Sequence, residues 1–287
     1  MDLSIIIPSY NTKTLLERCL TSVFTSLKNS AISFEVIVVD NASTDGTNEL
    51  LYTKFPRVKT ILNRSNIGYG KANNIAIQKA QGHSILLLNS DIEVKNGAIE
   101  RLYTFGKNHP RSFVGGKLLN EDGSPQPSCG PMYSLMVVAV MLFAKGDAFG
   151  ITRYCPNTSR EVDWVSGACL LGEKKVFDEV GYFDENIFLY MEEIDFLYRA
   201  KQIGYTVLFD PEARFLHTGA ASSGDHRTPV VNIYRGLLYF YKKHRSKLAL
   251  AILRSLLEAK ALAAILIGRM IGKRDIVQRY EEALSIL

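Results

Sequence analysis

The sequence predicts an α/β fold, in which helices cover a mixed, mainly parallel central sheet, followed by a helical C-terminal extension. Two observations predict it. Apolar runs bounded by turn residues alternate with segments of helical apolar spacing in the first part of the chain, and the last part is helical in character. The 287 residues, 47% hydrophobic and 22% charged, suit a large domain at 1–225 and an appendage at 226–287.

The first elements follow from apolar spacing and from the turn residues between the runs. The expected strands are 3–8, 34–39, 58–62 and 84–88, and the expected helices are 14–27, 47–55 and 69–80. Ligands of parallel, helix-covered sheets bind at the carboxyl ends of the strands. The polar residues at 9–11, 40–41 and 89–91 are therefore candidate site residues.

The middle of the chain is less regular. Prolines and glycines surround one apolar piece, 135–143, within residues 115–154, and we expect there a mobile loop with a short helix near the site. The following region indicates a strand at 167–171, a helix beginning at Glu173, an acidic helix at 191–202 and a strand at 206–209. Helical character resumes after residue 224.

The C-terminal run 248–268 is apolar except for Arg254, Glu258 and Lys260, charges that disfavour a membrane-spanning helix. On a helical projection most of the circumference is apolar, so something must cover it. Packing against protein and lying in a membrane interface are equally compatible with this pattern. The second interpretation draws on nearby basic residues, namely Lys242, Lys243, His244, Arg245, Lys273 and Arg274.

Composition excludes some classes of protein. The cysteines form neither a metal-ligand spacing nor a disulfide framework, and the N-terminus leads directly into an apolar strand too short for a signal peptide, so we expect a cytoplasmic location. The net charge of +5 is modest, and basic residues do not interleave with aromatic ones. This argues against nucleic acid and for an anionic cofactor or membrane surface.

Four segments carry candidate chemistry. Asp40, at a strand end, can accept hydrogen bonds from a base or a ribose. The glycines and lysine of 66–74 begin a helix, where backbone N–H groups favour phosphate, although a tight connection would look the same. Asp91 ends an apolar strand and can hold Mg²⁺ or Mn²⁺. The carboxylates of 191–195 lie among aromatic residues that favour a base with a raised pKa.

His217 follows a predicted strand, and by itself is more often a structural residue than a metal ligand. Asp195 and Arg199, four residues apart on a helix, suggest a structural pair that supports the acidic helix.

Taken together, these motifs resemble the family 2 glycosyltransferases of the Rossmann-like GT-A fold, in particular the bacterial rhamnosyltransferase-like branch. The matching segments, in order, are 4–11 (SIIIPSYN), 39–47 (VDNASTDGT), 66–70 (NIGYG), 88–91 (LNSD), 164–168 (WVSGA), 181–185 (GYFDE), 190–195 (YMEEID) and His217. Two positions depart from the family. The metal motif often reads Asp-x-Asp where this chain has Asn89-Ser90-Asp91, and the base is often aspartate where this chain has Glu193.

The resemblance implies a role for each matching position. Glu193 would be the catalytic base, and Asp91 and His217 would hold the divalent metal, Mg²⁺ or Mn²⁺. Asp195 would support the base helix. The donor nucleotide would be bound by Pro8, Ser9, Tyr10, Asp40, Asn66, Gly68, Lys71, Asn89 and Ser90, and the donor sugar and acceptor would lie near Trp164, Gly167, Ala168 and Glu192.

The function that the resemblance implies is metal-dependent, inverting sugar transfer from a nucleotide diphosphate sugar to a glycan or lipid-linked hydroxyl, in the synthesis of cell-surface polysaccharide such as O-antigen. dTDP-rhamnose is the first choice of donor, and a UDP-hexose or UDP-N-acetylhexosamine follows. We expect residues 120–160 to close over the donor, and residues 230–287 to reach the inner face of the plasma membrane or a partner. A second copy of the chain, in a homo-oligomer, is also among the possible partners.

Two rival functions belong to other classes. A nucleotidyltransferase would need no acceptor-side base, so the carboxylates of 192–195 argue against it. A non-catalytic scaffold subunit that binds nucleotide sugar would not need Glu193, Asp91 and His217 together.

Overall fold

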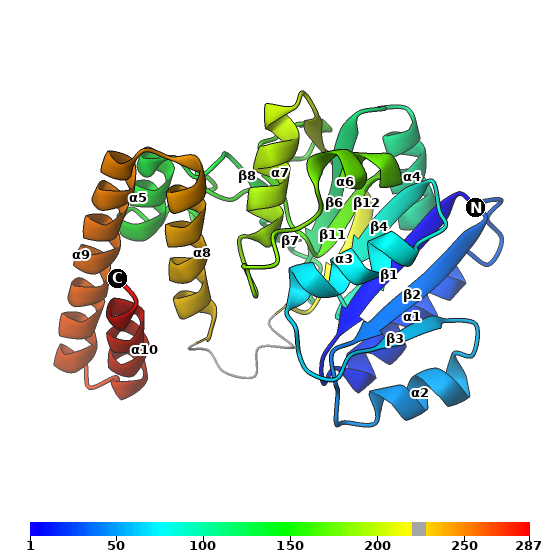
Figure 1. The fold of residues 1–287 in the computed structure, drawn as a ribbon, viewed down its shortest axis with the longest axis horizontal. Coiled ribbons are helices and arrows are strands. Elements are labelled where there is room, and N and C mark those ends of the chain that lie inside the picture. Colours follow the sequence, from blue (N-terminus) through cyan, green and yellow to red (C-terminus); the bar gives the residue numbers. More distant parts are fainter. Residues whose placement is uncertain (220–227) are drawn as a thin grey trace.

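A computed structural model describes residues 1–219 and 228–287 and shows a helix-covered sheet beside a bundle of helices (Figure 1). The first half of the sheet follows the predicted alternation. Parallel strands β1 (Leu3–Ser9), β2 (Phe34–Asp40), β3 (Lys59–Leu62) and β4 (Ser84–Leu88) lie in the order β3-β2-β1-β4, connected by helices α1 (Lys13–Ser26), α2 (Thr47–Lys54) and α3 (Tyr69–Lys79). These bounds confirm the expected elements to within one or two residues.

The second half of the sheet mixes strand directions. It continues from β4 in the order β11 (Cys169–Glu173), β6 (Ser112–Leu119), β12 (Thr206–His217) and β5 (Ile92–Val94). Of the eight strands on this path, β11 and β5 run against the others, since β11 pairs antiparallel with β4 and β6, and β5 with β12. The mixed, mainly parallel sheet of the predicted fold class is thereby confirmed. The short strands are β7 (Pro125–Gln126), β8 (Cys129–Gly130), β9 (Arg160–Glu161) and β10 (Trp164–Val165).

Each face of the sheet packs against its own apolar layer, because successive side chains of a strand point to opposite faces. Ile5 and Ile7 of β1 join one layer with helices α1 and α4 (Ala98–Lys107), whereas Ile6 joins the other with α3, α6 (Lys174–Val180) and α7 (Glu192–Gln202). The result is a three-layer arrangement that leaves the carboxyl ends of the strands open to ligand.

One expectation for the middle of the chain was wrong, and another gave a strand that was too short. Residues 115–119 belong to β6, inside the sheet, and not to a loop. The strand was not predicted because Gly115 and Gly116 suggest a turn. Both glycines are needed, since a β-carbon at Gly115 would lie 2.5 Å from a Val165 side-chain atom, and one at Gly116 would lie 2.5 Å from a Phe215 side-chain atom. The expected strand 206–209 is only the start of β12, whose register shifts between Asp210 and Arg214 before the strand continues to His217.

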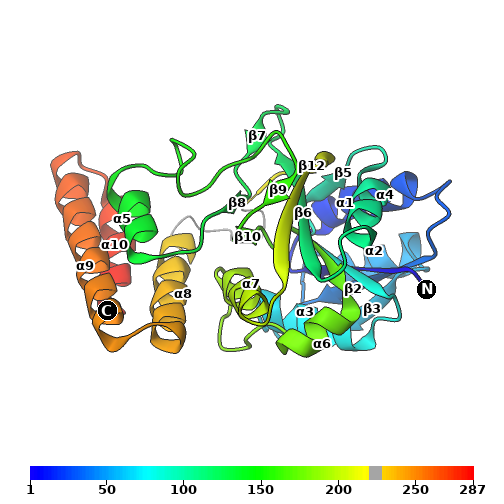
Figure 2. The same ribbon diagram turned by 90° about the horizontal axis from the view of Figure 1, so that it is seen from above.

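The C-terminal helices are α8 (Thr228–His244), α9 (Lys247–Met270) and α10 (Arg274–Ser285). The predicted short helix α5 (Leu135–Phe143) is confirmed. It packs against α9, so the C-terminal bundle includes one helix from the middle of the chain. Figures 1 and 2 show α8 between α7 and the remaining bundle helices. The expected domain boundary at 225 and 226 lies outside the described residues. Within the described ranges, every helix is too short or too polar to cross a membrane.

Candidate active site

The carboxyl ends of the parallel strands border a cavity of about 650 Å³, a volume typical of small-ligand sites. Most of the residues predicted for the site line this cavity. They are Pro8, Ser9, Tyr10, Asn66, Gly68, Asn89, Ser90, Asp91, Trp164, Gly167, Ala168, Glu192, Glu193 and His217. Segments that are distant in the sequence therefore meet at one place.

Three predicted residues are not among those that line the cavity. The Asp40 carboxylate accepts hydrogen bonds from the backbone N–H of Ser43, at 3.2 and 3.3 Å, and so shapes the turn after β2. Lys71 forms an ion pair with Glu185, with 3.2 Å between Nζ and Oε2. Asp195 is fully buried beside helix α8. None of the three side chains is brought to the cavity wall.

Asp91 and His217 meet at one side of the cavity. The Asp91 Oδ1 atom lies 3.4 Å from His217 Nε2, and Asp91 Oδ2 accepts a 3.0 Å hydrogen bond from the backbone N–H of Gly219. His217 Nδ1 lies 2.6 Å from Gln126 Oε1. Because an amide oxygen only accepts, this contact places a proton on Nδ1, so that in the neutral ring the lone pair of Nε2 faces Asp91.

This donor set fits a divalent cation. A carboxylate and an imidazole nitrogen whose tautomer is fixed by an outer partner are typical metal ligands. Among the described residues, no group of three or more His, Cys, Asp or Glu side chains is arranged to hold a metal ion. A metal at Asp91 and His217 would therefore keep coordination positions for water and for ligand oxygens, as Mg²⁺ commonly does.

Glu192 and Glu193 face the cavity from the first turn of α7. The Oε2 atom of each carboxylate is buried and has no hydrogen-bond partner among the described residues. Burial raises the pKa of Glu193, while backbone N–H groups and the nearby Arg153 guanidinium lower it. Burial and the charge of Glu193 raise the pKa of Glu192 well above its usual value. A buried carboxylate with a raised pKa is suited to accept a proton from substrate.

The turn before these two glutamates holds an uncommon backbone conformation. Tyr190 and Met191 have positive φ angles of 68° and 76°, which cost non-glycine residues on the order of 1 kcal/mol each. Helix α8 lies directly against this turn, since a β-carbon at Gly236 would lie 2.6 Å from Met191 Cγ and 3.0 Å from the Tyr190 carbonyl oxygen. The first turn of α7 is thus oriented by its surroundings.

Several cavity residues were missed by the sequence analysis. The Tyr69 hydroxyl donates a 2.6 Å hydrogen bond to the Gly167 carbonyl oxygen, and Arg153 places its guanidinium carbon 5.6 Å from the Trp164 ring centre. Tyr69 lies inside the 66–70 motif, which was a usable signal. Nothing in the sequence separates Arg153 from other arginines. Further lining residues are Tyr133, Met141, Phe188, Ile233 and Leu237.

The chain is similar in sequence to known proteins. The glycosyl transferase family 2 profile matches residues 4–128. The chain is 30% identical over 242 residues to the N-acetylglucosaminyl-diphospho-decaprenol L-rhamnosyltransferase of Mycobacterium tuberculosis, covering 77% of this chain and 78% of that protein. It is 29% identical over 210 residues to the low-salt glycan biosynthesis hexosyltransferase Agl10 of Haloferax volcanii, covering 70% and 62%.

Two solved structures have a similar fold. GalNAc-T7 with UDP, GalNAc and Mn²⁺ matches with a TM-score of 0.59 and 19% identity, covering 84% of this chain and 50% of that one. S. aureus TarS 1-349 matches with a TM-score of 0.56 and 15% identity, covering 99% and 90%. At these identities the likeness concerns the fold.

Proposed function

Because the chain belongs to glycosyl transferase family 2 and has the GT-A fold, we propose that it transfers a sugar from a nucleotide diphosphate donor to an acceptor hydroxyl, with inversion at the anomeric carbon. One observation carries the proposal. Asp91 and His217, at strand ends, and Glu193, on α7, line the same cavity. The first two are suited to hold a metal on the diphosphate, and Glu193 is suited to accept the acceptor proton.

The donor side of the proposed reaction uses the ends of β1 and β4. Ser9 and Tyr10 would contact the nucleotide, and Asp91 and His217 would hold Mg²⁺ or Mn²⁺, which when bound neutralises charge on the diphosphate. Asp40 would act indirectly, through the turn that it stabilises at Ser43. Since Lys71 pairs with Glu185, we propose no phosphate contact for it.

The acceptor side uses Glu193. The acceptor oxygen attacks the anomeric carbon and forms the new C–O bond, while the bond from that carbon to the diphosphate oxygen breaks and the nucleotide diphosphate leaves with the electron pair. The acceptor proton passes to the Glu193 carboxylate. Burial, which raises the pKa of Glu193, makes this carboxylate a stronger base than an exposed one. A single displacement of this kind inverts the anomeric configuration.

We propose dTDP-rhamnose as the donor and rhamnose as the transferred sugar. The similarity to the mycobacterial L-rhamnosyltransferase supports this choice. The name of that relative, a transferase for N-acetylglucosaminyl-diphospho-decaprenol, also supports a lipid-linked acceptor for the present chain. UDP-hexose and UDP-N-acetylhexosamine donors are alternative outcomes of the donor screen described below.

We also propose that residues 226–287 bring the enzyme to an anionic membrane surface. Helix α9 buries Leu253, Leu257 and Ala261 against the bundle, while the opposite face is apolar and exposed, with Leu266 at 62% and Met270 at 78% exposure. Exposed basic residues, Lys247, Arg254 and Arg269, lie along the same helix. An apolar face bordered by basic residues complements a bilayer with anionic headgroups.

The structure changes which basic residues can serve this contact. Lys243 and His244 were grouped with the membrane-facing residues, but both bond to the buried Asp195, and Arg245 donates to the Tyr198 hydroxyl. The membrane proposal therefore rests on α9. Replacing Leu262 and Leu266 by serine should release the protein from phosphatidylglycerol vesicles in a sedimentation assay. Tyr52→Ser, at an exposed aromatic residue on α2, is the control and should leave binding unchanged.

The catalytic proposal is tested by a screen of donor binding and donor hydrolysis with dTDP-rhamnose, UDP-glucose, UDP-galactose, UDP-N-acetylglucosamine and GDP-mannose, in Mg²⁺, Mn²⁺ or EDTA. We expect one donor to bind in a metal-dependent way, with affinity lost in Asp91→Ala and only turnover lost in Glu193→Ala. If no donor binds under any condition, the non-catalytic scaffold becomes the better description.

A further inference from the structure

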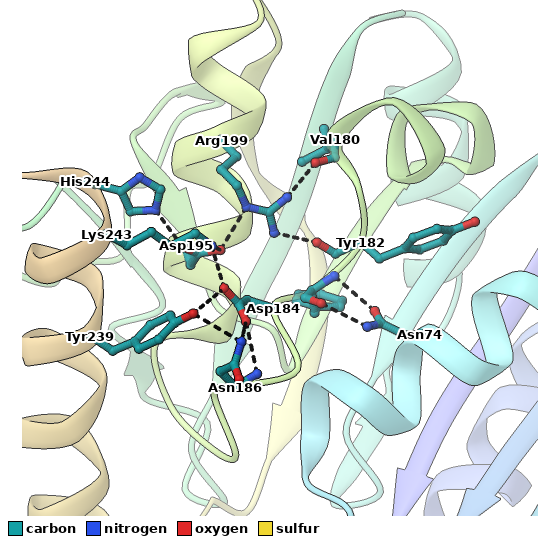
Figure 3. Close-up of polar contacts among 11 residues, drawn as sticks. Asn74, Val180, Tyr182, Asp184, Asn186, Asp195, Arg199, Tyr239, Lys243 and His244 are labelled. Carbon is teal, nitrogen blue, oxygen red and sulfur yellow. Dashed lines mark hydrogen bonds and ion pairs between the residues drawn. The ribbon is translucent and has the colours of Figure 1, made fainter.

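A partly buried polar cluster joins helix α7 to helix α8 and to the loop 183–186 (Figure 3). We call it the aspartate cluster, because two carboxylates organise it. Its members are Asp184, Asp195, Arg199, Tyr239, Lys243 and His244.

Lys243 of α8 binds both carboxylates of the cluster. Its Nζ atom lies 2.6 Å from Asp184 Oδ2 and 2.9 and 3.0 Å from the two oxygens of Asp195. His244 Nε2 lies 2.6 Å from Asp195 Oδ1, and Arg199 Nε donates to Asp195 Oδ2 at 2.8 Å. Asp195 is fully buried, so three cationic or hydrogen-bonding groups surround a carboxylate that water does not reach.

The cluster lies next to the proposed catalytic base. Asp195 and Glu193 share the first turn of α7, and α8 presses Gly236 against the strained Tyr190–Met191 turn that precedes it. Ile233 and Leu237, on the same helix, line the cavity. Helix α8 therefore touches the base-bearing turn through both a backbone contact and the aspartate cluster.

The same cluster is connected to helix α3. Asn74 of α3 exchanges hydrogen bonds with the backbone of Phe183, at 2.9 and 3.0 Å, and so fixes the loop that carries Asp184. A chain of contacts consequently runs from α3, through Asp184 and Lys243, to Asp195 and the first turn of α7.

Simple attachment of a C-terminal helix would not require such a cluster. Buried ion pairs often stabilise a fold no more than apolar side chains of the same volume would, because desolvation offsets their attraction. Their directional hydrogen bonds do specify one relative position of the joined elements. Here the joined elements are α7, which carries Glu193, α8, which lines the cavity, and the loop connected to α3.

We propose that Lys243 and His244 are positioning residues for Glu193, so that the C-terminal helices complete the catalytic site in addition to any role in membrane contact. This inference rests on the proposed function of Glu193. It predicts that breaking the cluster lowers turnover with a soluble acceptor analogue while the donor still binds.

The test compares Lys243→Met and Gly236→Ala with the wild type, and with Arg235→Met at an exposed position of α8 as control. We expect kcat to fall at least about tenfold in both variants, since displacing a catalytic group by about 1 Å can cost 100-fold, while the dissociation constant of the donor changes less than about twofold. Arg235→Met should behave as the wild type does. An unchanged kcat in both variants overturns the inference, as does an equal loss of donor affinity.

The pH dependence of kcat separates positioning from loss of folded protein. Glu193 faces Glu192 on its own helix, Arg153 and Tyr133 from the segment before β9, and Tyr69 from α3. If the first turn of α7 opens to water, the pKa of Glu193 falls and the acid limb of the profile moves to lower pH. Direct loss of the Lys243 charge would move it to higher pH. A lower kcat without any downward movement of the limb contradicts positioning.

Hydrogen exchange provides a readout that does not need activity. In Lys243→Met, amides of 192–196 should exchange at least about tenfold faster than in the wild type, whereas amides of β1 and β4 should not change. Unchanged exchange at 192–196 overturns the inference even if no donor is identified. Failure of the wild type to transfer sugar from any donor would instead count against the proposed function.

Discussion

The donor side and the acceptor side of the cavity are built in different ways. On the donor side, Ser9, Asn89 and Asp91 stand at or just beyond the ends of two neighbouring buried strands, and nearby hydrogen bonds such as that from Gly219 N–H to Asp91 hold them there. On the acceptor side, Glu193 sits on a helix whose start is fixed by contacts with α8, such as Lys243 to Asp195, 48 residues apart in sequence. In the proposed reaction, nucleotide binding would therefore depend mainly on the strand ends, and sugar transfer on the bundle as well.

The largest expected effect lies on the acceptor side. Glu193→Gln keeps the shape of the side chain but removes the base, so kcat should fall by about 1,000-fold, within the range for general bases. Donor affinity, measured by calorimetry, should stay within about twofold of the wild type. A parallel loss of donor affinity would break the comparison, because Glu193 would then belong to both sides.

The next largest effect concerns the donor side. Asp91→Ala removes the carboxylate that meets His217, so donor affinity in Mg²⁺ or Mn²⁺ should fall by about 100-fold, corresponding to roughly 2.7 kcal/mol, and should no longer respond to EDTA. The converse change, Asn89→Asp, restores the common Asp-x-Asp pattern and should strengthen metal-dependent binding. A full metal response in Asp91→Ala would assign the cation to other residues.

A smaller effect is expected on stability. Asp184→Asn should lower the free energy of unfolding at pH 7 by about 1–2 kcal/mol, because Lys243 and Tyr239 lose a charged acceptor. Burial opposes ionisation, but hydrogen bonds from Lys243 and its neighbours hold the pKa values of Asp184 and Asp195 below their usual range. Their contribution is therefore present above about pH 4 and is lost as pH falls through the lowered values.

Urea unfolding at pH 7 and pH 3 measures that contribution. The wild type should lose more stability between these pH values than Asp184→Asn, and Glu49→Gln, at an exposed position of α2, should follow the wild type. Equal acid sensitivity of all three proteins would show that the aspartate cluster contributes little to holding α8 in place.

The smallest effect is a displacement of the pH profile. The Arg153 charge lowers the pKa of Glu193 against the larger effect of burial. Arg153→Met should therefore move the acid limb of kcat to higher pH, opposite to the movement expected for Lys243→Met, whereas Arg153→Lys retains the charge and should leave the limb in place. The measurement is the pH dependence of kcat, recorded at saturating donor for the wild type and each variant.

The two sides also differ in what the sequence predicts. The strands 3–8, 34–39 and 84–88 and the polar residues after them are visible from apolar runs and turn residues, because parallel buried strands have little else in their sequence. The strand β6 was not predicted, because two adjacent glycines, Gly115 and Gly116, are typical of a turn. Only the structure shows that neighbouring side chains lie too close to these positions to allow a β-carbon.

On the acceptor side, the sequence motifs identified Glu192 and Glu193 but did not predict most of the contacts that position their helix. The pairing of Asp195 with Arg199, four residues apart, was visible and is confirmed. The bonds from Lys243 and His244 were not, because no local pattern connects residues of two distant helices. Of the basic residues at 242–245, Lys242 is exposed, whereas Lys243, His244 and Arg245 bond to residues of α7.

The packing of α5 against α9 has a consequence for synthesis of the chain. Helix α5 leaves the ribosome well before α9, and until α9 arrives the apolar side chains that it will cover have no partner. A shortened protein that ends before Lys247 would leave that surface exposed permanently, and would be prone to aggregate through it. Expression of the sheet domain alone should therefore require removal of α5 together with the terminal helices.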